Sequence, residues 1–165
     1  MKFEYLSKKG RLYFEGNELL KYRIEVPRFE EFEGCEEINT FYSEIMSECE
    51  RFCKETLFLK LCEDRNDKKH IYLLSAIVTH CDDEMICVVI FVTLKVDGSR
   101  FFEFKHSNLW GCRDGVAITP KMLLKRYGQK GKNKYKSPFL NRGRLEELES
   151  TYPEDIFSQR QEKVK

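Results

Sequence analysis

The sequence lacks any apolar run long enough to cross a membrane. Its longest unbroken apolar run, Met85–Val92, has eight residues, whereas a membrane-spanning helix needs about twenty. Met1–Gly10 carries no apolar segment of the kind found in secretory signals. The seven cysteines are odd in number and match no disulfide framework or CxxC pair. These absences predict a cytoplasmic protein with reduced cysteines and no membrane contact, unless a leader has been removed.

Familiar catalytic and nucleic-acid signatures are missing as well. The chain has no phosphate-binding loop, Rossmann glycine set, GxSxG or HExxH motif, and no RNP, KH, zinc-finger or helix-turn-helix signature. One cluster has the residue types of a metal or Cys–His site, namely His80 and Cys81 beside the acidic Asp82–Glu84. A polar hairpin end explains that cluster more simply. We therefore expect no cofactor, no catalytic residues and a non-enzymatic protein.

What the sequence does contain is enough apolar material for one folded domain. Its 165 residues are 41% hydrophobic, 13% aromatic and 35% charged, a composition that excludes a wholly disordered chain. A chain of this length buries roughly two-thirds of the surface that its unfolded form exposes. We expect a single domain over residues 1–127, with residues 128–165 forming a basic loop and short helical extension packed on it.

Hydrophobic periodicity predicts an α+β fold. Apolar residues at steps of three and four predict one long amphipathic helix from about Glu36 to Leu61. Alternation over Leu20–Val26 predicts the second strand of an N-terminal hairpin that turns at Gly16-Asn17 and ends at Pro27. Three further strands are expected as an antiparallel meander, with a hairpin turn at Asp97-Gly98: Ile71–Thr79, Met85–Val96 and Phe101–Asn108. The long helix should pack on this antiparallel sheet, followed by short C-terminal helices, the first of which opens at Thr119-Pro120.

Charge is unevenly distributed although the formal net charge is only +1. Residues 29–64 carry a net charge of −8, and residues 119–144 carry +9. The basic stretch is predicted either to bind phosphate or an acidic partner, or to complement the acidic helix of the same chain. The candidate binding-surface residues are Trp110, Arg113, Lys121, Lys125, Arg126, Lys130, Lys132, Lys134, Tyr135 and Lys136. Trp110, the only tryptophan, has two interpretations, as a core anchor or as an exposed binding residue.

Three short segments resemble a known family. They are Ile24–Phe29 at the end of the hairpin, Ile38–Tyr42 at the start of the helix, and Gly115–Leu124 after the last strand. This arrangement, over residues 20–127, resembles the extracytoplasmic domain of lysozyme-sensing anti-sigma factors and related uncharacterised bacterial domains. The resemblance implies a long helix on a curved antiparallel sheet and ligand recognition through surface loops. Seven cysteines and the missing signal and anchor depart from that family, so the fold is carried over and the ligand is not.

Three functions remain open from the sequence. The leading hypothesis is an uncharacterised bacterial protein that binds another, unknown protein. The alternatives are a nucleic-acid-binding module that uses residues 119–144, and an enzyme or metal protein of unrecognised type around His80 and Cys81. A homo-oligomer is compatible with each of them.

Overall fold

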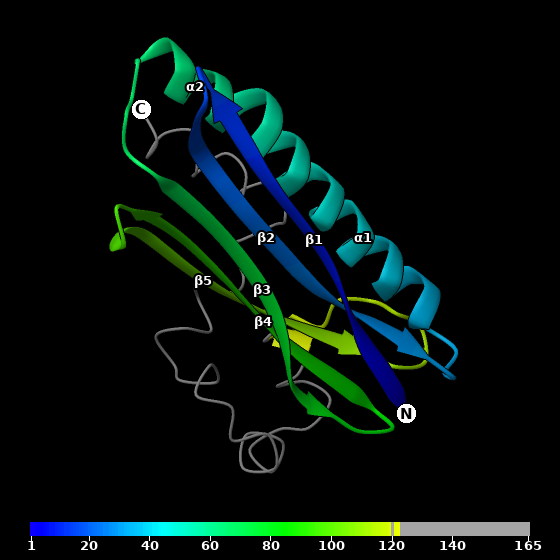
Figure 1. Cartoon of the computed structure of the whole chain (residues 1–165). Helices are drawn as coiled ribbons and strands as arrows, with labels where there is room; N and C mark the ends of the chain where they lie inside the picture. The colour runs from blue at the N-terminus through cyan, green and yellow to red at the C-terminus, as the bar shows by residue number, and fades with distance from the viewer. Residues whose placement is uncertain (120, 123–165) are drawn as a thin grey trace. The chain divides into compact units, whose positions relative to one another are not determined.

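The computed structural model describes residues 1–119, 121 and 122. Met1–Val116 form one compact unit, and a second unit begins at Ala117. The first unit has the predicted α+β class (Figure 1). Its elements in chain order are β1 (Lys2–Phe14), β2 (Asn17–Glu30), α1 (Cys35–Arg51), η1 (Phe52–Leu57), α2 (Phe58–Glu63), β3 (His70–Cys81), β4 (Met85–Val96) and β5 (Ser99–Gly111).

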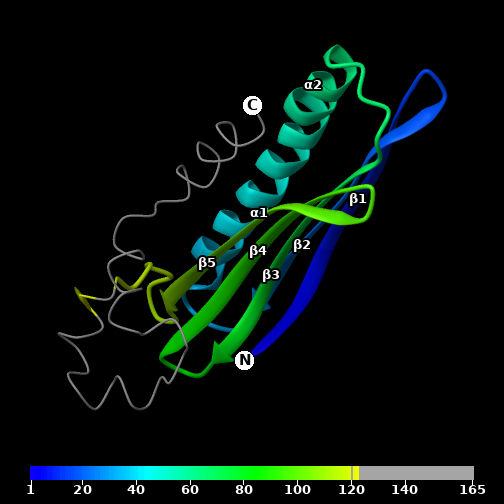
Figure 2. The ribbon, with the colours of Figure 1, turned by 90° about the vertical axis from the view of Figure 1, so that its left-hand side faces the viewer.

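The five strands form one sheet in the order β1-β2-β3-β4-β5 (Figure 2). The predicted hairpin and meander are both present, and their strands pair antiparallel. The two halves join through β2 and β3, which run parallel from Leu20↔His70 to Glu25↔Ser75. A helix that crosses the sheet returns the chain to the same end, so the strands before and after it run in the same direction. The sheet is therefore mostly antiparallel, with one parallel junction that the sequence did not predict.

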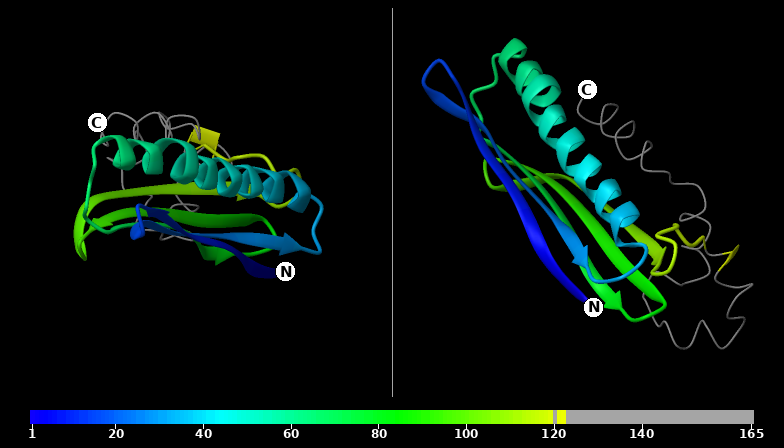
Figure 3. Two further views of the ribbon diagram at one scale, coloured as in Figure 1. Left: turned by 45° about the horizontal axis from the view of Figure 1, so that its top comes forward. Right: turned by 90° about the vertical axis from the view of Figure 1, so that its right-hand side faces the viewer.

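The elements α1, η1 and α2 form one continuous helix that covers one face of the sheet (Figure 3). Its buried stripe follows the predicted steps of three and four as far as Leu57, and from Cys49 onward it includes a row in steps of four, over Cys53, Leu57 and Leu61. Side chains spaced four residues apart drift around the axis of an ordinary α-helix, because it has 3.6 residues per turn. The wider π turn of η1 takes up this drift, and all three side chains remain buried against the sheet. Among the described residues, no helix is both long and apolar enough to span a bilayer.

Strand β2 continues through Pro27, contrary to the prediction that it ends there. Pro27 is buried and pairs with Tyr5 of β1. Pairing with β3 has already ended at Glu25, so the missing N–H of Pro27 costs no bond to that strand. Tyr5 reaches across this point, and its hydroxyl accepts a hydrogen bond from the Val78 N–H at 3.1 Å.

Asn39 fastens the start of α1 to the end of β2. Its side-chain Oδ1 accepts from the Phe29 N–H at 2.8 Å, and its Nδ2 donates to the Phe29 carbonyl at 2.9 Å. The amide thus pairs with a strand residue as a neighbouring strand would. The Ile38–Tyr42 segment, which carried part of the family resemblance, has this structural role.

The described part of the second unit is short. Thr119 Oγ1 accepts a hydrogen bond from the Met122 N–H at 3.2 Å, as a helix N-cap does. The rest of that predicted helix and the later short helices lie outside the described residues.

Candidate functional site

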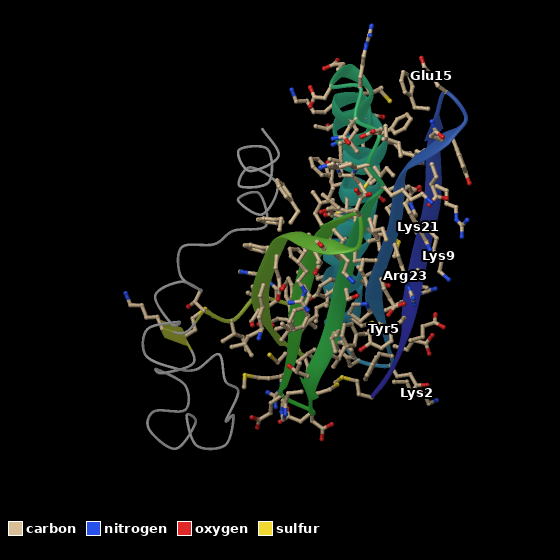
Figure 4. All side chains as sticks on the ribbon, turned by 60° about the vertical axis from the view of Figure 1, so that its left-hand side comes forward. Lys2, Tyr5, Lys9, Glu15, Lys21 and Arg23 are labelled. Atoms are coloured by element: carbon tan, nitrogen blue, oxygen red, sulfur yellow. The ribbon has the colours of Figure 1, made fainter. Side chains whose placement is uncertain are left out.

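Four basic side chains gather on the sheet face opposite the helix, along the middle of β1 and the part of β2 that pairs with it. They are Lys9 and Arg11 of β1 and Lys21 and Arg23 of β2, and all four are exposed. We call these residues the basic cluster. The strand register sets Lys9 directly opposite Arg23, and Arg11 directly opposite Lys21. Figure 4 shows Lys9, Lys21 and Arg23 together along the two strands.

This arrangement works against the stability of the hairpin. Like charges directly opposite each other on neighbouring strands repel. Arg11 is 3.5 Å from Glu18, and Arg23 is 2.6 Å from Glu25, so the two arginines have acidic neighbours. Within residues 1–119, Lys9 and Lys21 have no ion-pair partner. Among residues 1–119, the basic cluster therefore has two exposed positive charges that no acidic side chain neutralises.

The cluster belongs to a wider face that no described helix covers within the first unit (Figure 3). Across the sheet from Lys21 lie Ile71 and then Lys95, as the pairings of β2 with β3 and of β3 with β4 show. Farther along, Lys105 Nζ lies 5.2 Å from the centre of the Phe91 ring. This face combines positive charge with apolar surface, which suits a partner that is both acidic and apolar.

On the other face of β1, one carboxylate ties the edge strand to the helix. Glu50 of α1 accepts from Lys8 at 2.8 Å, from the Tyr22 hydroxyl at 3.1 Å and from Lys54 at 3.1 Å. The Lys8 hydrogen bond is the main cause that lowers the pKa of Glu50 to about 2, with Lys54 and Tyr22 acting the same way against partial burial. Gly10 leaves room for the Tyr22 ring, because a Cβ there would collide with it. This network holds β1 in place.

We expect Glu50→Gln to remove a pH-dependent share of stability. The pKa of Glu50 is lower in the folded chain than its ordinary 4.5, so its charge stabilises the fold above that value. The contribution is lost as the pH falls from about 4.5 to about 2. Because 22% of the Glu50 side chain is exposed, solvent screening leaves about 1 kcal/mol near neutral pH.

Urea unfolding of the parent and variant across this pH range measures the difference. Glu48→Gln is the matched control, because the ion pair of Glu48 with Arg51 is exposed. A difference between parent and Glu50→Gln that does not shrink at low pH would contradict the role given to Glu50.

The structure places the sequence-predicted binding residues in different surroundings. Trp110 is buried in the core, the first of its two interpretations, and its Nε1 donates to the Tyr42 hydroxyl at 2.9 Å. Arg113 and Lys121 are exposed. The remaining candidates lie outside the described residues: Lys125, Arg126, Lys130, Lys132, Lys134, Tyr135 and Lys136.

The cluster at His80 and Cys81 closes a hairpin end. His80 Nε2 is 3.0 Å from Asp82, and Cys81 Sγ is 2.9 Å from the Met1 sulfur. Burial raises the pKa of the Cys81 thiol, and it raises that of Cys112 to about 12. Such thiols stay protonated and are poor nucleophiles. Among the described residues, no three His, Cys, Asp or Glu side chains are arranged to hold a metal ion, and none of the seven cysteines forms a disulfide.

Solved structures share the arrangement of helix and sheet. A DUF3298 family protein from Pseudomonas aeruginosa superposes with a TM-score of 0.51 and 11% identity, over 90% of this chain and 71% of the other. A member of the same family from Bacteroides fragilis gives a TM-score of 0.56 and 9% identity, over 96% and 73%. The chain has the fold of DUF3298 family proteins.

At this low sequence identity, the structural similarity shows that the chain has the DUF3298 fold and shows nothing about its function. No family model matches the chain, and no curated protein matches it. The resemblance to uncharacterised bacterial domains is thus supported at the level of fold. The narrower resemblance to lysozyme-sensing anti-sigma factors stays a prediction.

Proposed function

We propose that this protein is a non-catalytic binding domain that holds an acidic segment of another protein on the basic cluster. The observation that carries the proposal is the opposition of like charges across β1 and β2, with Lys9 and Lys21 left without acidic partners among the described residues. Repulsion of this kind weakens a hairpin. An acidic ligand removes the repulsion and gains charge-assisted hydrogen bonds.

The surroundings of the cluster support a protein ligand. Apolar side chains adjoin the charges on the same face, among them Ile71, Leu73 and Ile77, and Ile77 is 43% exposed. A protein segment offers both carboxylates and apolar side chains to such a surface. At the His80–Cys81 end, burial raises the pKa of the Cys81 thiol, which disfavours the thiolate that a nucleophile needs.

We expect the double variant Lys9→Gln/Lys21→Gln to bind polyglutamate at least about fivefold more weakly than the parent, which corresponds to about 1 kcal/mol. Its free energy of unfolding should be unchanged or slightly higher, because two repulsive cross-strand pairs are relieved. Fluorescence anisotropy of a labelled polyglutamate peptide at low salt measures the binding, and urea unfolding measures the stability.

Arg51→Gln/Lys60→Gln is the control, since it removes the same charge from exposed helix positions that have acidic neighbours. The proposal fails if both double variants lose affinity equally or if the parent does not bind polyglutamate. Tighter binding of a mixed single-stranded DNA than of polyglutamate would also overturn it, in favour of a nucleic-acid partner.

A further inference from the structure

Strand β1 is a long edge strand. It pairs with β2 over its whole length, from Lys2↔Glu30 to Phe14↔Asn17, and no described strand pairs with its other side. Every second residue of β1 therefore points its N–H and carbonyl away from the sheet. Such a row of backbone groups is a template for one more strand.

The side chains of β1 do not protect this edge along its full length. Five of its large apolar side chains are at least 36% exposed, and the strand contains no proline. The exposed residues are Phe3, Tyr5, Leu6, Tyr13 and Phe14. Like charges gather only in the middle of the strand, at Lys8, Lys9 and Arg11, whereas the start of the strand carries one charge of each sign, at Lys2 and Glu4. An incoming strand must therefore be acidic opposite this middle segment.

A groove borders the helix side of β1 at Leu6. It has a volume of about 430 Å³ and lies between the β1–β2 hairpin and α1. Leu6, Val26, Pro27 and Met46 form its apolar lining, and Arg28 and Glu44 add one charge of each sign. A groove of this volume holds several apolar side chains.

We propose that β1 receives an extended acidic segment of a partner protein as a sixth strand of the sheet. This inference rests on the proposed function and names how the partner binds. Successive side chains of a strand point to opposite faces of a sheet. One set of partner side chains therefore meets the basic cluster, and the other set enters the groove beside Leu6. The recognised segment alternates acidic and apolar residues.

Charge excludes a second copy of this chain as the preferred occupant. Antiparallel pairing of two β1 strands over their full length sets Lys8 opposite Lys8 and places the two Lys9 side chains diagonally across from each other on one face. Like charges opposite each other destabilise a strand pair. An acidic strand has the opposite sign and meets no such repulsion.

A short peptide of alternating valine and glutamate tests the inference on the full chain. We expect it to bind at least about fivefold more tightly than a peptide of the same composition with its glutamates in one block. In the bound peptide, the N–H groups of every second residue pair with β1. Methylation of the backbone nitrogens of those residues should therefore abolish binding. Methylation of the other set, which faces away, should change the affinity by less than about twofold.

A variant of the groove gives an independent measurement. Leu6→Gln should weaken binding of the alternating peptide by about fivefold, whereas Leu59→Gln, at a position 51% exposed on α2, should not.

If both methylated peptides bind like the unmethylated peptide while Lys9→Gln/Lys21→Gln still loses affinity, strand addition is wrong and the proposed function stands. If Lys9→Gln/Lys21→Gln keeps full affinity, the proposed function is wrong. A concentration-dependent dimer in sedimentation that the peptide does not dissociate would place a second copy on the edge and overturn the inference.

Discussion

Replacing Trp110 with alanine is expected to lower the free energy of unfolding by about 4 kcal/mol. The indole is 6% exposed, and its ring centre lies 4.8 Å from that of Phe41. Its Nε1 donates to the Tyr42 hydroxyl, which is itself completely buried. The variant therefore loses a large buried side chain and leaves the Tyr42 hydroxyl without its donor.

Phe101→Ala is the matched control, because Phe101 lies on the same strand and is 64% exposed. It should change the free energy of unfolding by less than about 1 kcal/mol. Urea unfolding followed by circular dichroism measures both variants. Tryptophan fluorescence is not used, because Trp110 is the only tryptophan and Trp110→Ala removes it. Equal losses of unfolding free energy in the two variants would contradict a core role for Trp110.

Replacing Gly34 with alanine is expected to cost about 3 kcal/mol. Gly34 begins the turn into α1, and its N–H donates to the Cys112 carbonyl at 2.9 Å. A Cβ at Gly34 would lie 2.7 Å from the Gly115 Cα and closer still to the Gly115 nitrogen. Both are backbone atoms, so the loop after β5 has to move before the extra carbon fits.

The cost at Gly34 is steric and not conformational. The φ of Gly34 is −86°, a value that alanine adopts without strain. The neighbouring Glu33 is exposed, so Glu33→Ala should leave the free energy of unfolding within about 0.5 kcal/mol of the parent. Thermal unfolding of the two variants side by side measures the difference, and equal midpoints would show that the two loops do not touch.

The elements with strong local signals were predicted from the sequence. The helix has a long stripe at helical spacing, and its observed bounds differ from the prediction by one or two residues. The turn at Asp97-Gly98 has positive φ at both residues, 48° and 81°, as its sequence predicts. For the first strand of the hairpin the sequence predicts only Leu12–Glu15, whereas β1 spans Lys2–Phe14, because Lys8, Lys9 and Gly10 interrupt its apolar pattern. As an edge strand, it has no need of a continuous apolar face.

The parallel junction and the basic cluster depend on register, which one sequence does not reveal. The alternation of Leu20–Val26 is the same whether the neighbouring strand is parallel or antiparallel. The sequence shows that the first 28 residues carry excess positive charge. It does not show that Lys9 meets Arg23 and that Arg11 meets Lys21. In the sequence the denser basic stretch at residues 119–144 is the stronger signal, and most of that stretch lies outside the described residues.

The parallel junction also has a consequence for the route by which the chain folds. The β1–β2 hairpin and the β3–β4–β5 meander each join strands that are close in sequence, so each closes short loops. The six pairs between β2 and β3 join residues about fifty positions apart, and closing so long a loop carries a larger entropy cost. We therefore expect the two halves to form locally and their pairing under the helix to be the late and slow event. Until then β2 and β3 are themselves open edges, exposed to the same kind of pairing that we propose for β1.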